Sequence, residues 1–289
     1  MTASADSPEF SVPDDLFPGT IVILAPHMDD ETLACGGTIA ALSDKSRILV
    51  AFVTDGAMSP APTFRWQGSP STSLPAVRKR EAENALSTLG VPKDNIYFLD
   101  YPDGELSAHV DDLAVRLAEI LKSTKPAFVF VPFRYDRHPD HLATYAAAIA
   151  ASEIATNAPR IVEYFVYYKW RLVSGGDVRD WIRSDCLATV DTSEQRRLKL
   201  TALRCYESQT TVREEWQTRA ILPPERLGEV SQSPEMFLVH HEEFPGSLIF
   251  ERGRRWIPLV HRIEPVLKKQ KDRFNAFVRL ITSAKQTQG

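Results

Sequence analysis

The sequence of 289 residues lacks a cysteine framework, a strong net charge and any long apolar run. Its three cysteines include no Cys-x-x-Cys pair and cannot all pair with one another, which excludes a disulfide scaffold and favours a reducing compartment. A net charge of −4 gives no indication of a nucleic-acid partner. No stretch approaches the roughly 18 consecutive apolar residues of a transmembrane span, and the first residues lack the segments of a secretory signal. We therefore expect a soluble, cytoplasmic protein with no transmembrane span and no nucleic-acid partner.

Four short apolar runs, rich in β-branched residues, indicate strands that are buried on both faces. They are TIVILAP (20–26), SRILVAFVTDG (46–56), NIYFLD (95–100) and PAFVFVP (126–132). Helix-like stretches follow them at about 33–44, 76–89, 110–124 and 140–154. Strands that alternate with helices are typical of βαβ units with right-handed crossovers. The expected fold class is therefore α/β: a Rossmann-like, doubly wound, mostly parallel sheet with a strand order near 3-2-1-4-5, flanked by helices.

The pattern becomes weaker towards the end of the sequence. It still predicts a fifth strand at 160–168, a sixth at 185–191 and a helix from Ser193 to about Tyr206. The segment 56–75 has four prolines and no period, which predicts a long loop of the kind that often forms a lid. We expect two regions: a Rossmann-like catalytic domain over 15–210, and a C-terminal extension over 211–289 packed on the same domain.

The last part of the sequence is basic. From Arg252 to Gly289 it has ten Lys or Arg residues against two acids, and apolar side chains recur at roughly helical spacing. We favour a terminal helix that packs on the domain and exposes its basic face to solvent. A basic amphipathic helix that meets a membrane surface or an anionic partner is the alternative.

Two polar clusters follow the first and the fourth predicted strands. Their members are His27, Asp29, Asp30 and Glu31 in the first cluster, and His138, Asp140 and His141 in the second. In a sheet of order 3-2-1-4-5 these two strands are neighbours, and their carboxyl ends lie where such sheets bind ligands. Imidazole and carboxylate at this density suit zinc or a similar divalent ion. The two clusters together therefore predict one metal site.

Each cluster alone also has a plainer interpretation. The acids after the first strand could cap a helix and complement its dipole. In the second cluster Pro139 could open a helix, with Asp140 in its first turn. The occurrence of both clusters after neighbouring strands favours the metal site. A second pair, His240 and His241, adjoins two glutamates, and there we favour a surface cluster over a second metal site.

With these motifs the sequence resembles the PIG-L/LmbE-like family of zinc-dependent N-acetylglucosamine deacetylases. The family's hallmark pair matches PHMDDE (26–31) and HPDH (138–141). The further similar features are TDG (54–56), Arg78 and Glu81 ahead of an Ala-rich helix that ends in LGV (89–91), YPDGEL (101–106) and CYESQ (205–209). Met28 stands where the family usually has proline. A thioether is a poor zinc ligand beside imidazole and carboxylate, so we expect no change in the metal chemistry.

The resemblance implies the roles of the first cluster and of His141. His27, Asp30 and His141 become the ligands of one Zn²⁺ ion per chain. Asp29 becomes the general base that takes a proton from the attacking water. Glu31 we expect to support the site through hydrogen bonds.

The resemblance also implies roles for four further residues. His138 stabilises the oxyanion or protonates the leaving amine, and Asp140 orients His138. Arg78 and Asp103 match positions that contact the substrate. For these two, a helix-surface arginine and a turn-forming Pro-Asp-Gly are the plainer interpretations.

The activity implied is that of a zinc-dependent hydrolase that removes an N-acetyl (N-acyl) group from a glucosamine-containing small molecule. Such an enzyme acts on a linear amide C–N bond. Two alternatives stay open: a metal-dependent esterase or phosphoesterase on the same scaffold, and a non-catalytic sugar-binding relative. The absence of a P-loop or GxGxxG sequence argues against phosphoryl chemistry. The aglycone stays open, and so does a homo-oligomer.

Overall fold

The computed structural model describes residues 16–59, 73–156, 159–170, 176–213, 217–232, 234–240, 246–251, 253 and 255–263. Most of the predicted loop at 56–75 and most of the basic segment 252–289, where a terminal helix is predicted, lie outside the described residues. The chain forms two compact units. The first comprises Met1–Val166 and Asp185–His240, and the second comprises Tyr167–Ser184 and His241–Gly289.

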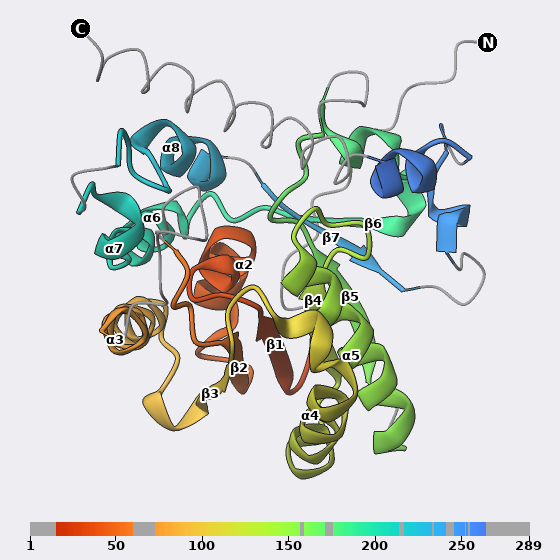
Figure 1. Ribbon diagram of the computed structural model, residues 1–289, viewed down its shortest axis with the longest axis horizontal. Coiled ribbons are helices and arrows are strands. Elements are labelled where there is room, and N and C mark those ends of the chain that lie inside the picture. Colours follow the sequence, from red (N-terminus) through yellow and green to blue (C-terminus); the bar gives the residue numbers. More distant parts are fainter. Residues whose placement is uncertain are drawn as a thin grey trace, which may run out of the picture. The chain divides into compact units, whose positions relative to one another are not determined.

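A seven-stranded sheet forms the centre of the first unit, in the order β3-β2-β1-β4-β5-β7-β6 (Figure 1). The predicted α/β class and the predicted order 3-2-1-4-5 are confirmed. The parallel strands are β1 (Ile21–Ala25), β2 (Ile48–Thr54), β3 (Ile96–Tyr101), β4 (Phe128–Pro132) and β5 (Arg160–Tyr164).

The sheet continues beyond β5 with two antiparallel strands. β6 (Leu187–Val190) corresponds to the predicted sixth strand, but it lies at the edge of the sheet and not beside β5. β7 (Glu235–Val239), which no sequence pattern indicated, lies between β5 and β6 and pairs with both. The sheet therefore takes one strand from beyond residue 210, and the predicted division into 15–210 and 211–289 stays a prediction.

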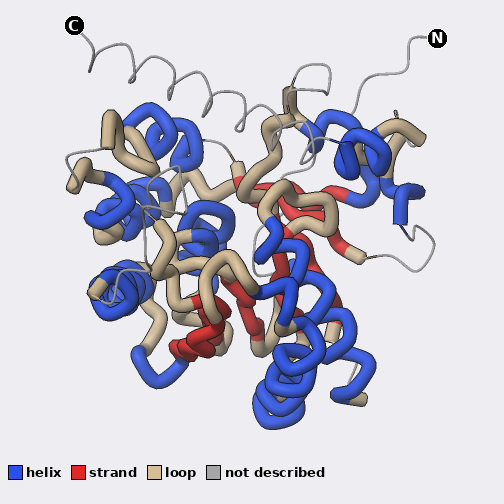
Figure 2. The backbone as a smooth tube through the Cα atoms, in the orientation of Figure 1, coloured by secondary structure: helices blue, strands red, loops and turns tan. Residues whose placement is uncertain are grey.

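Helices cover both faces of the sheet (Figure 2). They are α2 (Asp30–Leu42), α3 (Leu74–Thr88), α4 (Val110–Thr124), α5 (Pro139–Ala155), α6 (Arg196–Arg204), α7 (Glu207–Thr210) and α8 (Pro224–Gln232). One core lies between the sheet and α2, α3, α6 and α8, and the other lies between the sheet and α4 and α5. The sheet is therefore doubly wound, as predicted.

The two cores explain why the strand sequences are apolar without interruption. Successive side chains of a strand point to opposite faces. In β1, Ile21 and Ile23 enter one core, and Val22 and Leu24 enter the other. A central strand therefore needs apolar residues at every position, and β1, β2 and β4 are buried throughout.

The described residues of the second unit form irregular chain, short 3-10 turns and a helical stretch at 257–263. A bridge joins Lys169 to Asp177, and another joins Ile182 to Phe250. The Trp170 side chain is fully buried, and its ring stacks on that of His261 with centroids 5.9 Å apart. In the part of the chain that the structure describes, no helix has the length and apolar character needed to cross a membrane.

Candidate metal centre

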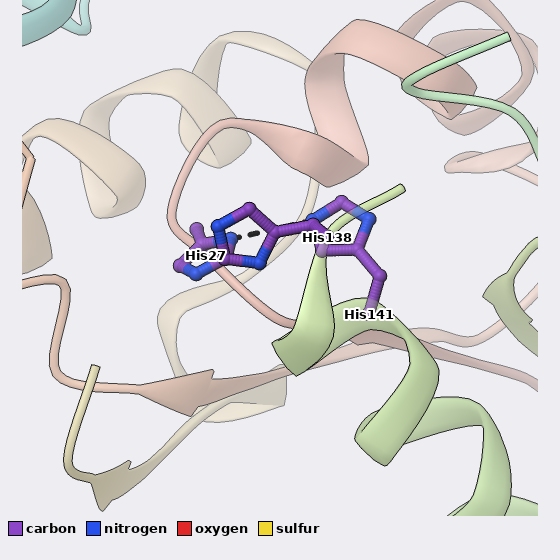
Figure 3. Close-up of side chains that lie close together, drawn as sticks. All are labelled: His27, His138 and His141. Atoms are coloured by element: carbon purple, nitrogen blue, oxygen red, sulfur yellow. Dashed lines mark hydrogen bonds between the residues drawn. The ribbon is translucent and has the colours of Figure 1, made fainter. Parts of the chain in front are cut away.

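The two predicted clusters meet where β1 and β4 end. β1 and β4 are parallel neighbours, so their carboxyl ends lie at the same edge of the sheet. His27 follows β1, His138 is the N-cap of α5, and His141 lies in the first turn of that helix. Figure 3 shows the three imidazole rings close together.

Three of the predicted ligand atoms form a nearly regular triangle. His27 Nδ1 lies 3.3 Å from Asp30 Oδ2 and 3.3 Å from His141 Nε2. His141 Nε2 lies 3.2 Å from Asp30 Oδ2. His141 is fully buried, and Asp30 and His27 are nearly so. We call these three atoms the donor triangle.

The donor triangle has the size that a tetrahedral zinc ion requires. With metal–ligand distances of about 2.0–2.1 Å, two corners of the tetrahedron lie about 3.3–3.4 Å apart. Two imidazoles and one carboxylate leave the fourth corner for water, which is typical of catalytic zinc sites. The residues present therefore fit such an ion.

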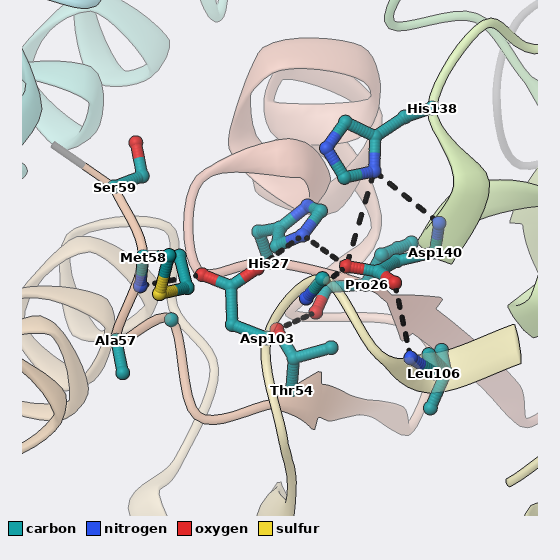
Figure 4. Close-up of polar contacts among 12 residues, drawn as sticks. Pro26, His27, Thr54, Ala57, Met58, Ser59, Asp103, Leu106, His138 and Asp140 are labelled. Atoms are coloured by element: carbon teal, nitrogen blue, oxygen red, sulfur yellow. Dashed lines mark hydrogen bonds and ion pairs between the residues drawn. The ribbon is translucent and has the colours of Figure 1, made fainter. Parts of the chain in front are cut away.

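A second set of donors faces the other nitrogen of the His27 ring. His27 Nε2 lies 3.3 Å from Asp103 Oδ1 and 3.2 Å from Asp140 Oδ2 (Figure 4). The Asp140 carboxylate also accepts hydrogen bonds from the backbone N–H groups of Gly104, at 2.8 Å, and Leu106, at 3.2 Å. Carboxylates that hold one imidazole nitrogen commonly orient the other nitrogen towards a metal. Asp140 and Asp103 are placed to do this for His27.

Asp136 is a site residue that the sequence interpretation missed. It is buried, its Oδ2 lies 3.2 Å from His141 Nδ1, and its Oδ1 accepts a hydrogen bond from the His138 N–H at 2.9 Å. It therefore holds His141 much as Asp140 holds His27. The available signal was an acid between the fourth strand and HPDH, at the position where a residue that orients a ligand is needed.

Asp29 adopts a strained backbone conformation. Its φ of 150° and ψ of −23° lie where non-glycine residues cost about 1–3 kcal/mol. Asp29 is the N-cap of α2, but its side chain makes no capping hydrogen bond to the described residues. Burial raises the pKa of Asp29 to about 7, and the nearby Arg78 opposes the rise. The Asp29 carboxylate is therefore buried without capping the described part of α2.

The second cluster also begins a helix, as its plainer interpretation predicted. Pro139 begins α5, and Asp140 lies in its first turn. The Asp140 N–H donates to Nδ1 of the His138 ring at 3.3 Å, so His138 caps the helix through its side chain. One motif thus starts the helix and supplies the site.

The carboxylates change the pKa values of the histidines in different directions. Burial lowers the pKa of His27, but hydrogen bonds to Asp103, Asp140 and Asp30 outweigh burial and raise it well above its usual range. Burial lowers the pKa of His141, but Asp136 and Asp30 outweigh burial and raise the pKa to about 9. The side chains that face the donor triangle therefore favour a positive charge there.

Burial and the two neighbouring imidazoles lower the pKa of His138 to about 4. Burial raises the pKa of Asp30, but His141 and His27 hold it well below its usual range. Asp30 is therefore an anion beside the two imidazoles, and His138 is a neutral ring.

Glu31 connects the site to the helices behind it. Its carboxylate is fully buried and accepts hydrogen bonds from the hydroxyls of Thr32 and Tyr206. Its Oε2 accepts the Asp29 N–H at 3.2 Å. Burial raises the pKa of Glu31 to about 7. Tyr206 begins the Tyr-x-Ser-Gln part of the CYESQ motif, so this motif contacts the first one.

The predicted substrate residues lie close to the other site residues. Asp103 Oδ2 accepts a hydrogen bond from the Met58 N–H at 2.9 Å. Burial raises the pKa of Asp103, but His27 outweighs burial and lowers the pKa to about 2. Arg78 is 1% exposed, and its Nη2 lies 3.5 Å from Asp29 Oδ1. Contact of Asp103 and Arg78 with a substrate stays a prediction.

His240 contacts other residues and not the donor triangle. Its ring hydrogen-bonds the buried Glu163 and Arg134. His241 and the glutamates beside it lie outside the described residues. Among the residues described, donor groups that could hold a metal ion occur only around His27.

Comparison with known proteins gives a family match over the part of the chain that builds this site. Residues 22–152 match PIG-L, the GlcNAc-PI de-N-acetylase family. Diacetylchitobiose deacetylase of Thermococcus kodakarensis is 28% identical over 200 residues, which cover 65% of this chain and 69% of that protein. The probable N-acetyl-alpha-D-glucosaminyl L-malate deacetylase 2 of Bacillus cereus is 29% identical over 194 residues, covering 66% of this chain and 83% of that protein.

A solved structure shares the fold. The N,N′-diacetylchitobiose deacetylase of Pyrococcus horikoshii, in complex with its inhibitor MPG, has a TM-score of 0.57 at 24% identity, over 83% of this chain and 91% of that one. The relatives named here are deacetylases, which are hydrolases of amide bonds, the enzyme class that the sequence predicted. Residues 22–152 of this chain are therefore similar to the PIG-L family, the family that the sequence motifs resemble.

Proposed function

We propose that this protein is a zinc-dependent hydrolase that removes the N-acetyl group from a glucosamine-containing small molecule. The observation that carries the proposal is the donor triangle of His27, Asp30 and His141, whose edges of 3.2–3.3 Å match a tetrahedral ion. The names of the deacetylase relatives support the substrate class. A divalent ion bound there would polarise the amide carbonyl and lower the pKa of water.

In this proposal Asp29 is the general base. Its carboxylate follows the His27 loop directly and makes no capping hydrogen bond to the described part of α2. Asp29 and Asp30 are adjacent, yet only Asp30 belongs to the donor triangle. That leaves the Asp29 carboxylate available to take a proton from the attacking water.

His138 is placed to meet the substrate in its neutral form. The His138 side chain is 34% exposed, whereas His27 and His141 are buried. Its Nδ1 accepts the Asp140 N–H, so in the neutral ring the proton is on Nε2. We therefore assign His138 to donate a hydrogen bond to the oxyanion. Asp140, 3.9 Å from His138 Nδ1 but 3.2 Å from His27 Nε2, acts on both rings.

The test is release of free amine and acetate from a panel of N-acetylglucosaminides. The panel contains N-acetylglucosamine, N,N′-diacetylchitobiose and N-acetylglucosaminyl malate, each assayed with zinc-loaded and chelator-treated protein. We expect metal-dependent release from at least one of them. An esterase would cleave acetyl esters and leave the amides intact, and a non-catalytic relative would release nothing; either result would overturn the proposal.

Asp29→Asn tests the base directly. This variant should keep the metal bound and lower kcat by about 100- to 10,000-fold, the usual contribution of a general base. Asp100→Asn is the matched control, since Asp100 is an exposed carboxylate whose partner is Lys79. Full turnover by Asp29→Asn would show that another group is the base.

A further inference from the structure

Arg78 is a charged side chain buried beside the site. It extends from α3 and is 1% exposed, which places it among the largest fully buried side chains of the described residues. A buried guanidinium is costly unless it is hydrogen-bonded, so its partners indicate its role. Among the described residues, the hydrogen-bond and ion-pair partners of its terminal nitrogens belong to the loops that follow β1 and β2, and its Nε has no partner there.

Its strongest contact is with the peptide bond that precedes Asp29. Nη2 donates a hydrogen bond to the Met28 carbonyl at 2.6 Å, and the same nitrogen lies 3.5 Å from Asp29 Oδ1. Nη1 reaches the Gly56 carbonyl at 3.5 Å. Arg78 therefore links the loop that contains the Asp29 carboxylate to the loop after β2.

That peptide bond is held at both of its polar ends. Its carbonyl accepts from Arg78, and its N–H, which belongs to Asp29, donates to Glu31 Oε2 at 3.2 Å and to the His27 carbonyl at 3.1 Å. The orientation of this peptide plane sets φ of Asp29, which has the strained value of 150°. Such a conformation persists only where the surroundings impose it. Arg78 and Glu31 supply that constraint from opposite sides.

Gly56 leaves the space that Arg78 needs. A Cβ at this position would lie 3.0 Å from Arg78 Cδ, 3.0 Å from Arg78 Nη1 and 3.0 Å from Met28 Cε. Gly56 also has a φ of +66°, which favours glycine. The TDG turn after β2 thus accommodates the guanidinium, which gives this sequence feature a structural reason.

We infer that Arg78 is a positioning residue: it holds the Met28–Asp29 peptide in its strained conformation and so directs the Asp29 carboxylate. This inference rests on the proposed role of Asp29 as base. The predicted contact between Arg78 and a substrate stays a prediction, and the kinetics below separate it from the positioning role, because both terminal nitrogens of the guanidinium already face protein groups while Nε has no partner among the described residues.

Arg78→Met and Arg78→Lys, compared with Arg80→Met, test the inference by kinetics. Arg80 is an exposed arginine on the same helix, and its substitution should change nothing. For Arg78→Met we expect kcat to fall by about 100-fold with KM and zinc content unchanged, the size of loss that a displacement of about 1 Å produces. Arg78→Lys keeps one donor and should retain more of kcat. A rise in KM at constant kcat would identify a substrate contact and overturn the inference.

A crystal structure of Arg78→Met separates this inference from the proposed function. We expect the Met28–Asp29 peptide to rotate and φ of Asp29 to leave its strained value. If wild-type protein hydrolyses no amide, the proposed function fails, and this structure still decides what Arg78 does. An unchanged peptide in the variant would show that Arg78 does not hold it. Arg78→Lys gives the same readout if Arg78→Met does not fold.

Discussion

Two clusters of charged side chains lie at the carboxyl ends of the strands, and they differ in how their charges are balanced. In the first, Glu163 on β5 accepts hydrogen bonds from the Arg134 backbone N–H and from Arg134 Nε, both at 2.7 Å, and it also contacts His240. In the second, around His27, the buried carboxylates are those of Asp29, Asp30, Asp103, Asp136 and Asp140. Arg78 is the guanidinium that lies beside them.

The comparison indicates that converging donor atoms, and not the density of charge, distinguish the proposed metal centre. The Glu163 carboxylate is matched by a guanidinium and an imidazole, so it needs nothing from outside the chain. Around His27 five buried aspartates outnumber Arg78 and the imidazoles of His27 and His141, whose pKa values they raise, and three donor atoms face one point. A divalent ion bound there would balance the buried carboxylates.

The largest expected effect comes from removing a ligand. His141→Ala should abolish stoichiometric zinc binding and lower turnover by at least about 1,000-fold, because the metal contributes several kcal/mol and each 1.4 kcal/mol is about tenfold. His240→Ala, in the balanced cluster, should keep both. Elemental analysis measures the zinc content of both variants, and amine release measures their turnover. Equal zinc loss in both variants would remove the distinction between the clusters.

The next effect is on stability and concerns the balanced cluster. Glu163→Gln should lower the free energy of unfolding by about 3–5 kcal/mol, because it leaves the partly buried Arg134 guanidinium without its anion. Zinc stoichiometry should not change. Urea unfolding measures the difference, with the exposed Glu119→Gln as control, for which we expect a change within about 0.5 kcal/mol.

The same variant should change how stability depends on pH. Burial raises the pKa of Glu163, but His240 and Arg134 outweigh burial and hold it below its usual value. Because the folded pKa is the lower one, the carboxylate stabilises the fold above its unfolded pKa of about 4.3, and this stability is lost as the pH falls through the folded value. Glu163→Gln should therefore lose less stability in this acid range than the wild-type protein. If the free energy of unfolding depended on pH in the same way in both proteins, the stabilising role of the Glu163 carboxylate would be refuted.

The smallest expected effect comes from the residues that orient the ligands. Asp140→Asn should weaken zinc binding by about 10- to 100-fold without abolishing it, because His27 loses the carboxylate that holds its Nε2. Asp136→Asn should act similarly through His141. A competition titration with a chromogenic chelator measures the affinity. Wild-type affinity in both variants would show that these aspartates do not orient the ligands.

The sequence predicted the features that depend on local pattern and on general rules of α/β folds. β1, β2 and β4 are buried on both faces, so their apolar runs were unambiguous. The position of the two motifs after strands that this topology makes neighbours was enough to bring His27 and His141 together. The sequence did not predict β7, because this strand is short, starts with the buried Glu235 and follows a region without a clear period.

The contacts that the sequence does not report depend on which way a ring or a guanidinium points. Asp140 was expected to orient His138, which stays a prediction, and its Oδ2 also lies 3.2 Å from His27 Nε2. Arg78 was expected to contact a substrate, which stays a prediction, and it also hydrogen-bonds the Met28 carbonyl. Glu235 holds Lys199 and the N–H groups of Gly37 and Thr38, a partnership across almost 200 residues that no local pattern reports.

The most direct test of the central claim is a crystal structure of the zinc-loaded protein with anomalous data collected at the zinc edge. We predict one ion at about 2.0–2.2 Å from His27 Nδ1, Asp30 and His141 Nε2. An ion on His27 Nε2 between Asp103 and Asp140, or no anomalous peak within reach of the donor triangle, would contradict this account.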